Sequence, residues 1–459
     1  MRVPRPRATA SAVEPLTVLR ALPAGTTGDA RIIRSESTTI RFANGRVRQP
    51  HLERSTQVSL RLADGRRLAS ATGSDDTAEG WRRLVASASA LARVAPVERK
   101  FPGFRAPGGR GPTGLAFSKH TAELPPEGAT RMAEEILDAA GAEAPGARIA
   151  GVVQVGHEQL RVVNSSGLDR TTHRSVAFAN VLVERPDQDP PVSGWSEAAH
   201  WDAARLGPAA LGREGAERMA RVPPEPVAAG AYPVVLRGPA VGLLLQFLGN
   251  LGFAANGEVE GWSCFRQRRG KRVAPKSVTV VDDPRSRDTL PRAIDYEGTW
   301  TRATPLIAEG IVRPVVTDLI TSGRLARPLT GHALPPEAPW GDYGPIPTNM
   351  ILGAGDASED ELVRETRRGL LVTRFHYVRV VDPGRGIITG MTRDGTYSIE
   401  NGEVARPVRN LRFTESLLTA LDGVRLLGKE RRIYSEGGES VTAPAAALAS
   451  FRFTSATLF

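Results

Sequence analysis

Alternating apolar and polar residues dominate the first part of the chain. Two pairs of such runs are each joined by a short turn: residues 31–42 and 46–51 by Asn44-Gly45, and residues 57–62 and 66–71 by Asp64-Gly65. Asn-Gly and Asp-Gly between alternating runs are strong hairpin signals, because these residues tolerate the positive φ of tight turns. The pattern therefore predicts two antiparallel hairpins.

Helical spacing follows the second hairpin. Five apolar residues share one face of a helix expected over residues 78–93: Trp81, Leu84, Val85, Ala88 and Leu91. The preceding Asp75-Asp76-Thr77 is typical of a helix cap. A segment rich in Pro, Gly and Arg, residues 95–127, predicts a loop, and a second helix is expected over 129–140. Further strands are expected over residues 147–155, 159–164 and 174–183.

Changes in pattern divide the chain into four parts. We expect a flexible tail over 1–15, an N-terminal α/β domain over 16–190, a helical linker over 191–226 and a C-terminal β-rich domain over 227–459. Helical pattern in the linker runs over 197–221. The C-terminal β-runs cover residues 232–236, 276–281, 369–381, 396–400, 408–413 and 451–457, with turns at Asp394-Gly395 and Asn401-Gly402. The expected class is α+β: an N-terminal sandwich of helices on an antiparallel sheet, and a C-terminal barrel or sandwich with one packed helix.

Composition places the chain among ordinary globular proteins but gives it a net charge of +10. Lysine accounts for only five of the 60 basic residues, and Ala, Gly and Pro are abundant, which indicates the bias of a GC-rich genome. One dense basic cluster covers residues 266–272 (RQRRGKR). It fits a solvated hairpin tip or, less well, a contact with a polyanion; no interleaved aromatic residues suggest stacked bases, so nucleic acid is not an expected partner.

Nothing in the sequence points to a membrane. The apolar stretches, such as residues 241–245, are far shorter than the roughly 20 residues a spanning helix needs. The basic N-terminus has no apolar segment typical of a secretory signal. The single Cys264 excludes an internal disulfide and fits a reducing cytoplasm, so we expect a cytoplasmic protein.

Several blocks of the second half together resemble the TldD/TldE (PmbA) family. They are residues 230–236 (GAYPVVL), 295–298 (DYEG), 330–334 (TGHAL), 347–355 (PTNMILGAG), 369–377 (GLLVTRFHY) and 390–395 (GMTRDG). The resemblance implies a two-domain protein that assembles as a dimer. It further implies a cytoplasmic complex in which a zinc-bearing TldD subunit pairs with a TldE subunit to cleave small unfolded peptides, including leader peptides of natural products.

The resemblance also implies a zinc motif, HExxxH, on the helix that begins near Pro239. In this chain the three motif positions are Leu245, Gln246 and Asn250. None of these side chains is a zinc ligand or a general base at neutral pH. The family's third ligand, a cysteine, would lie near residue 434 or 435, whereas the only cysteine is elsewhere. We therefore expect no catalytic residue and no metal or other cofactor in this chain, with zinc in the partner subunit.

The same helix is apolar nearly all round. Its side chains include Leu243, Leu244, Phe247, Leu248 and Leu251. A helix with this pattern is buried on every side, which favours a structural or interface role.

Three residues in the family-like blocks are candidates for substrate binding: His332, Arg374 and His376. The histidines fit a peptide contact or, better, an ordinary structural role. Arg374 fits either a bidentate contact with a peptide carboxylate or a pair with an acid on a neighbouring strand. Carboxylates at 282–283 and 295–297 could form an acid/base pair, but turn chemistry explains them better.

Two functions remain open from the sequence. The first is the non-catalytic TldE-like subunit of a heterodimeric zinc metalloprotease, with a zinc-bearing TldD-like subunit as partner. The second is a stand-alone homodimeric pseudoenzyme that binds a peptide or a protein without cleaving it.

Overall fold

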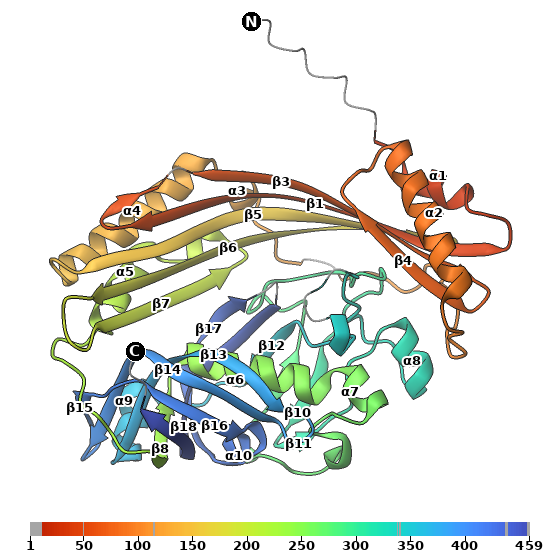
Figure 1. Ribbon diagram of the computed structural model, residues 1–459. Helices are drawn as coiled ribbons and strands as arrows, with labels where there is room; N and C mark the ends of the chain where they lie inside the picture. The colour runs from red at the N-terminus through yellow and green to blue at the C-terminus, as the bar shows by residue number, and fades with distance from the viewer. Residues whose placement is uncertain are drawn as a thin grey trace, which may run out of the picture.

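The computed structural model describes residues 12–48, 50–112, 115–336, 338, 341–436 and 439–456. The chain forms an α+β structure with a long antiparallel sheet in its N-terminal half and a larger mixed sheet in its C-terminal half. Figure 1 shows the long strands of the first sheet crossing the top of the molecule, above the C-terminal half. Within the described ranges, no helix is long and apolar enough to cross a membrane.

The N-terminal sheet is antiparallel throughout. Its strands are β1 (Thr26–Ala43), β2 (Arg46–Val47), β3 (His51–Asp64), β4 (Arg67–Gly73), β5 (Arg148–Asn164), β6 (Asp169–Arg185) and β7 (Val192–His200). The order is β4-β3-β1-β5-β6-β7, and β2 pairs with β1. The hairpin turns predicted at 44–45 and 64–65 are confirmed, since Asn44, Gly45 and Gly65 have positive φ.

Helices cover this sheet at its two ends. They are α1 (Pro15–Arg20), α2 (Ala78–Val94), α3 (Lys119–Ala122), α4 (Pro126–Glu143) and α5 (Pro208–Glu217). The predicted face of α2 buries Trp81, Leu84 and Ala88 against β3, and the Thr77 side chain caps its first turn. At the other end, α4 and α5 pack together, with Ile136 in a core shared with Phe42.

The C-terminal half contains a closed ring of strands. Its strands are β8 (Gly230–Leu236), β9 (Val280–Asp282), β10 (Thr304–Ala308), β11 (Ile311–Val312), β12 (Asn349–Leu352), β13 (Gly369–Asp382), β14 (Ile387–Glu400), β15 (Glu403–Pro407), β16 (Leu411–Ser416), β17 (Val424–Glu436) and β18 (Glu439–Ala456). Strand β8 pairs with both β13 and β18, so β18-β16-β14-β13-β8 closes on itself. Of the predicted barrel or sandwich, the structure shows the barrel, with β12-β9-β10-β11 extending from one side and β17 from another.

Five helices and a widened turn accompany this ring. They are α6 (Gly238–Leu248), the π-turn η2 (Gly249–Phe253), α7 (Ala255–Glu260), α8 (Leu319–Leu325), α9 (Glu359–Thr366) and α10 (Leu417–Asp422). Helix α6 packs against β18 and β13, and most of its residues are buried, which confirms the expectation from its apolar pattern.

Four expectations are corrected by the structure. The predicted helix from residue 197 is wrong at its start, because Val192–His200 is strand β7. Alternate residues of this strand are buried, and its backbone pairs with β6. The only α-helix described in this segment is Pro208–Glu217, preceded by a 3-10 turn at Ala203–Arg205, and its Gly215 packs against Gly194 of β7. The segment predicted to be a helical linker thus supplies a strand and a helix to the N-terminal layer.

The other corrections concern ends and turns. The strands expected over 147–155 and 159–164 form one strand, since β5 pairs without a break with β1 and β6. Asp394-Gly395 is a bulge inside β14 rather than a hairpin turn, because β13 pairs with β14 on both sides of it. Of the predicted tail, residues 1–11 lie outside the described residues, but Ala12 bridges to Thr77 and Pro15 begins α1.

Candidate functional site

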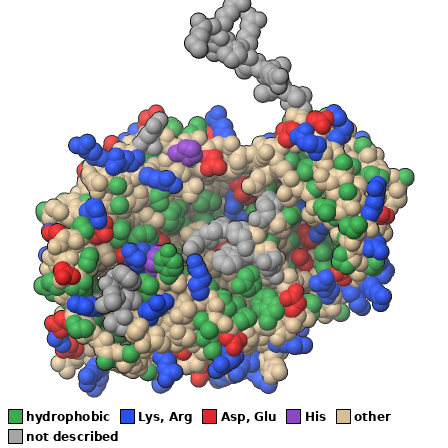
Figure 2. Space-filling view, in the orientation of Figure 1, with side chains coloured by type: hydrophobic (Ala, Val, Ile, Leu, Met, Phe, Trp, Pro, Cys, Tyr) green, Lys and Arg blue, Asp and Glu red, His purple; other side chains and the backbone are tan. Residues whose placement is uncertain are grey.

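Helix α6 borders a cleft between the two halves of the molecule. The cleft has a volume of about 250 Å³ and is lined by residues of both halves: Phe178, Asn180, Trp195 and Glu197 from β6 and β7, Pro239, Gly242, Leu243 and Gln246 from α6, Arg374 and Phe375 from β13, and Tyr434, Ser435, Glu439 and Val441 from β17 and β18. Figure 2 shows the molecule hollowed between its halves, with hydrophobic side chains in the hollow.

The three motif positions lie on or just after α6, but their side chains do not face the same cavity. Gln246 lines the cleft, whereas Leu245 lines a separate apolar cavity together with Val241 and Leu248. Asn250 is buried in the π-turn, and its Oδ1 has no hydrogen-bond partner among the described residues. An unsatisfied buried carbonyl oxygen is costly, so this position is not optimised for stability alone.

The position expected for the third zinc ligand does reach the cleft. Tyr434 packs its ring on Gly238 and Gly242 of α6, and a Cβ at Gly238 would collide with the Tyr434 hydroxyl. Burial raises the pKa of Tyr434 above its ordinary value, so the phenol stays neutral. The neighbouring Ser435 hydroxyl donates to the carbonyl of Glu439 at 2.8 Å.

This set of donors does not fit zinc. Zinc sites in proteins use imidazole, thiolate and carboxylate ligands, three of them in a catalytic site. The helix offers an aliphatic side chain and two amides, and the strand offers a phenol and a hydroxyl. Across the parts of the chain that the structure describes, no group of three or more His, Cys, Asp or Glu residues could hold a metal ion.

Arg374 lies in the cleft and has partners from both halves. Its Nε donates to Asp394 Oδ2 at 2.6 Å, and its Nη2 pairs with the same oxygen. Its guanidinium also stacks on the ring of Trp195. Of the two roles that the sequence left open, the structure shows the pair with an acid on a neighbouring strand.

His332 lies in the wall of a smaller cavity of about 110 Å³ that shares Glu439 with the cleft. Its Nε2 lies 2.8 Å from Asp282 Oδ2 and its Nδ1 lies 2.9 Å from Thr330 Oγ1. Only 2% of the residue is exposed. Both ring nitrogens therefore have partners within the fold, which fits the structural role.

His376 lines neither cavity. It is partly buried beside Tyr377, with the two ring centres 4.7 Å apart. Burial lowers its pKa, and the nearby Arg393 and Arg374 lower it further. The structure thus separates the three predicted binding residues, and only Arg374 lies in the cleft.

The carboxylates at 295–297 form a buried network between the halves. Asp295 Oδ1 accepts from the backbone N–H groups of Glu297 and Thr299, which is the predicted turn chemistry. Glu297 accepts from Arg61 of β3 at 2.6 Å and from the backbone N–H of Leu319 at 2.8 Å. Burial raises the pKa of Asp295 to about 6 and that of Glu297 to about 7. Glu297 thus joins the halves through Arg61, Asp295 holds backbone of the C-terminal half, and neither acid lines the cleft.

Several cleft residues were not predicted from the sequence. Trp195 and Glu197 lie on β7, partly within a segment predicted to be helical, so their alternation was not recognised. Glu439 begins β18 and reaches the cleft only because the last hairpin folds back toward α6. No motif in the sequence marks these residues; the stacking of two layers brings them together.

Comparisons with known proteins agree on one family. A model described as the PmbA/TldA metallopeptidase C-terminal domain matches residues 229–455, and a model described as PmbA/TldA metallopeptidase domain 1 matches residues 28–92. A metalloprotease of Methanothermobacter thermautotrophicus is 27% identical over 227 residues, which are 49% of this chain and 48% of that protein. A metalloprotease TldD homolog of Buchnera aphidicola is 26% identical over 211 residues, 44% of this chain and 42% of that protein. The matched region thus spans about half the length of these curated relatives.

A solved structure extends the likeness to nearly the whole fold. The crystal structure of TldE from Thermococcus kodakarensis superposes with a TM-score of 0.83 at 18% identity, covering 93% of this chain and 96% of that one. At this identity the superposition shows a shared fold.

Proposed function

Because the chain belongs to the PmbA/TldD metallopeptidase family, we propose that it is the non-catalytic, TldE-like subunit of a two-subunit zinc metalloprotease. Its partner would be a zinc-bearing TldD-like subunit, and the substrate a small unfolded peptide or leader peptide. One observation carries the proposal: Leu245, Gln246 and Asn250 occupy the motif positions and present no zinc ligand.

The chemistry of these side chains supports a subunit without its own active site. An aliphatic group has no lone pair to give to a metal, and a carboxamide does not take up a proton at neutral pH as a general base must. Leu245 also points into an apolar cavity, away from Gln246 and the cleft. Hydrolysis therefore depends on residues and metal of the partner.

The cleft offers a way to hold an extended peptide. Within the described part of each sheet, β7 pairs only with β6, whereas β17 pairs with β18 and makes one bridge on its other edge, between Gly428 and Ala357. Both strands border the cleft, through Trp195 and Tyr434 respectively. A strand with one unpaired edge can bind a peptide through backbone hydrogen bonds, with little dependence on peptide sequence. The single Cys264 fits a reducing cytoplasm, where we place the complex.

Co-expression with a zinc-bearing TldD-like homologue tests the proposal. We expect the two chains to co-elute in size-exclusion chromatography and to cleave an unfolded peptide together, while this chain alone does not. The matched control is the same partner purified without this chain. Cleavage by the partner alone at the full rate of the complex, or zinc-dependent cleavage by this chain alone, would refute the proposal. A homodimer that ignores the partner and binds the peptide intact would support the stand-alone pseudoenzyme instead.

A further inference from the structure

The fold places the arginines of the basic cluster at 266–272 in different surroundings. Arg269 turns inward, where its Nη2 donates to Glu258 at 3.1 Å and its guanidinium lies over the Phe253 ring at 5.2 Å. Arg272 donates to the backbone carbonyl of Glu309 at 2.7 Å. Residues 266–268 form a short 3-10 helix rather than a hairpin tip, so the predicted solvated hairpin is wrong.

The other two arginines meet a third from a distant part of the chain. Arg266 and Arg268 line a cavity of about 440 Å³ together with Arg385, from the turn between β13 and β14. We call this cavity the arginine pocket. The rest of its lining includes Gln267, Ser416 and Thr419 and contains no aspartate or glutamate. None of the three guanidinium groups has an ion-pair partner among the residues that the structure describes.

The backbone around the arginine pocket is well held, although the guanidinium groups are not paired. The N–H of Arg385 donates to Asp382 Oδ1 at 3.0 Å, and its carbonyl accepts from the Ser416 hydroxyl at 3.3 Å. Gly261 has a φ of +91° and no side chain, which leaves room for the Arg266 guanidinium against its Cα. These contacts hold the backbone of Arg385 and place Arg266 beside Gly261, while all three arginines are exposed to solvent.

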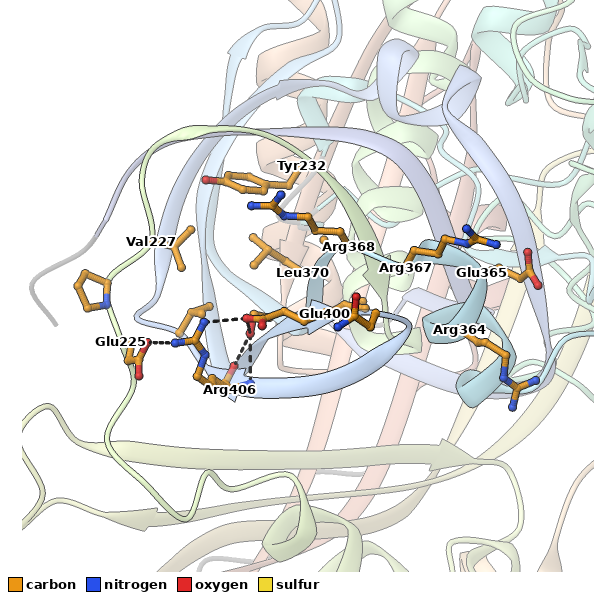
Figure 3. Close-up of a pocket in the computed structure, with 16 residues that line it drawn as sticks. Glu225, Val227, Tyr232, Arg364, Glu365, Arg367, Arg368, Leu370, Glu400 and Arg406 are labelled. Carbon is orange, nitrogen blue, oxygen red and sulfur yellow. Dashed lines mark hydrogen bonds and ion pairs between the residues drawn. The ribbon is translucent and has the colours of Figure 1, made fainter.

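Another cavity of the C-terminal half, of about 940 Å³, contains an arginine whose charge is compensated. Arg406 lies between Glu225 and Glu400, with each ion pair at 2.8 Å. Figure 3 shows these pairs, and shows Arg364 directed away from them. Glu365 also lines that cavity, so its lining has three glutamates beside four arginines. In the arginine pocket, by contrast, the positive charge lacks any acid in the lining.

We propose that the arginine pocket binds a diphosphate group, either free or carried by a larger molecule. Guanidinium forks suit phosphate oxygens because they donate two parallel hydrogen bonds and stay charged at all accessible pH values. A volume of about 440 Å³ lies within the usual range for small-molecule sites. No aromatic side chain lines the pocket, so bases of a nucleic acid strand have no stacking surface there.

The arginine pocket would bind the diphosphate without reacting with it. Cys264 is the one thiol in the lining, but only 4% of it is exposed and burial raises the pKa of this thiol to about 12. The thiolate is therefore scarce at neutral pH. The proposal is independent of the peptide cleft, which has different lining residues.

Isothermal titration of the full chain with pyrophosphate tests the proposal. We expect saturable binding that is weakened about tenfold or more in the variant R266Q/R268Q/R385Q and weakened by salt between about 50 and 200 mM. The matched control is R41Q/R213Q/R302Q, which loses the same charge from exposed arginines without ion pairs and should bind within about twofold of wild type. Melting temperatures verify folding, and the three single Arg→Gln variants replace the triple variant if it does not fold.

Further ligands distinguish the source of the diphosphate. Equal affinity for pyrophosphate and ADP would show that the diphosphate alone is recognised, and tighter ADP binding that the pocket takes it as part of a larger molecule. Both results support the proposal. It is overturned if pyrophosphate does not saturate the wild type, if the control variant loses as much affinity as the pocket variant, or if a single-stranded oligonucleotide binds more tightly than either ligand.

Discussion

The guanidinium of Arg374 lies 3.8 Å from the centre of the Trp195 ring, so that a barrel strand stacks on the edge strand of the N-terminal sheet. The same guanidinium pairs with Asp394, whose side chain is 1% exposed, and Ser193 of β7 donates to that carboxylate at 2.7 Å. Cation–π stacking and a charge-assisted hydrogen bond both strengthen when water is excluded. This contact therefore joins the two halves at the cleft that α6 borders.

Replacing Arg374 with glutamine should destabilise the protein strongly. The substitution leaves Asp394 buried without its main countercharge, and breaking such a pair costs on the order of 3 kcal/mol. Urea unfolding followed by tryptophan fluorescence measures the loss. Arg412→Gln is the matched control, because Arg412 is exposed on β16 without an ion pair and its loss should cost less than about 0.5 kcal/mol. Equal stability of the two variants would contradict the role assigned to Arg374.

Replacing Gly238 with alanine should also be destabilising, although alanine favours helices. A Cβ at this position would collide with the Tyr434 ring, and overpacking a buried contact costs about 1–3 kcal/mol. In a Tyr434→Ala background the same substitution should cost less, because the ring is gone. A double-mutant cycle in urea measures the coupling. Additive effects would show that Tyr434 does not occupy the space above Gly238.

Stability should fall as the pH rises from about 4.5 to about 7, in part because of Glu297. Burial raises the pKa of this carboxyl to about 7 from an ordinary 4.5, so in this window the folded chain binds more protons than the unfolded chain. The free energy of unfolding therefore decreases with pH there and levels off above it. In Glu297→Gln the fall between pH 5 and 8 should shrink by on the order of 2 kcal/mol.

The control for this pH effect is Glu365→Gln, which removes an exposed carboxylate without an ion pair and should keep the wild-type slope. The comparison uses the change with pH rather than the absolute stability, since Glu297→Gln also weakens the contact with Arg61. An unchanged slope in Glu297→Gln would mean that Glu297 is ionised throughout the window.

The purified chain should bind no stoichiometric zinc. The cleft presents amides, a phenol, a hydroxyl group and the carboxylates of Glu197 and Glu439, but no imidazole or thiolate ligand. Metal analysis after dialysis measures the content, with the zinc-bearing partner as positive control. About one zinc per chain would disprove this prediction and point to a ligand set outside α6.

Restoring the motif in the variant L245H/Q246E/N250H should not create a protease. Leu245 and Gln246 face different cavities, so a histidine at 245 enters an apolar space while the glutamate enters the cleft. The π-turn at Gly249–Phe253 supplies the widened helix that the motif spacing requires, but the third ligand is still missing. Each polar group left unpaired should cost on the order of 1–3 kcal/mol.

A peptide-cleavage assay with added zinc, together with the melting temperature, checks this variant. We expect no cleavage and a lower melting temperature. The single variant Gln246→Glu is the control, because it changes only the cleft-facing position. Zinc-dependent cleavage by the triple variant at wild-type stability would show that the site survives in this chain.

Local patterns in the sequence were sufficient to predict those parts of the fold that depend on residues close together along the chain. The hairpin turns at 44–45 and 64–65, the α2 face with Trp81 and the burial of α6 all follow from turn chemistry and from periodicity. The family resemblance and the absence of zinc ligands at Leu245, Gln246 and Asn250 were likewise visible in the residues. A C-terminal barrel or sandwich was predicted too, from alternating strands and turn signals, and the structure shows the barrel.

Only the tertiary structure decided which distant residues meet. The alternation along β7 is weak, and part of this segment was predicted to be helical. The structure makes it a strand, because its backbone pairs with β6. Asp394-Gly395 has the sequence of a turn, but pairing along both sides of the bulge keeps it inside β14 and brings Asp394 to Arg374. The cleft and the arginine pocket each join residues more than 100 positions apart. Such contacts depend on how the layers stack, and a local sequence pattern carries no information about that.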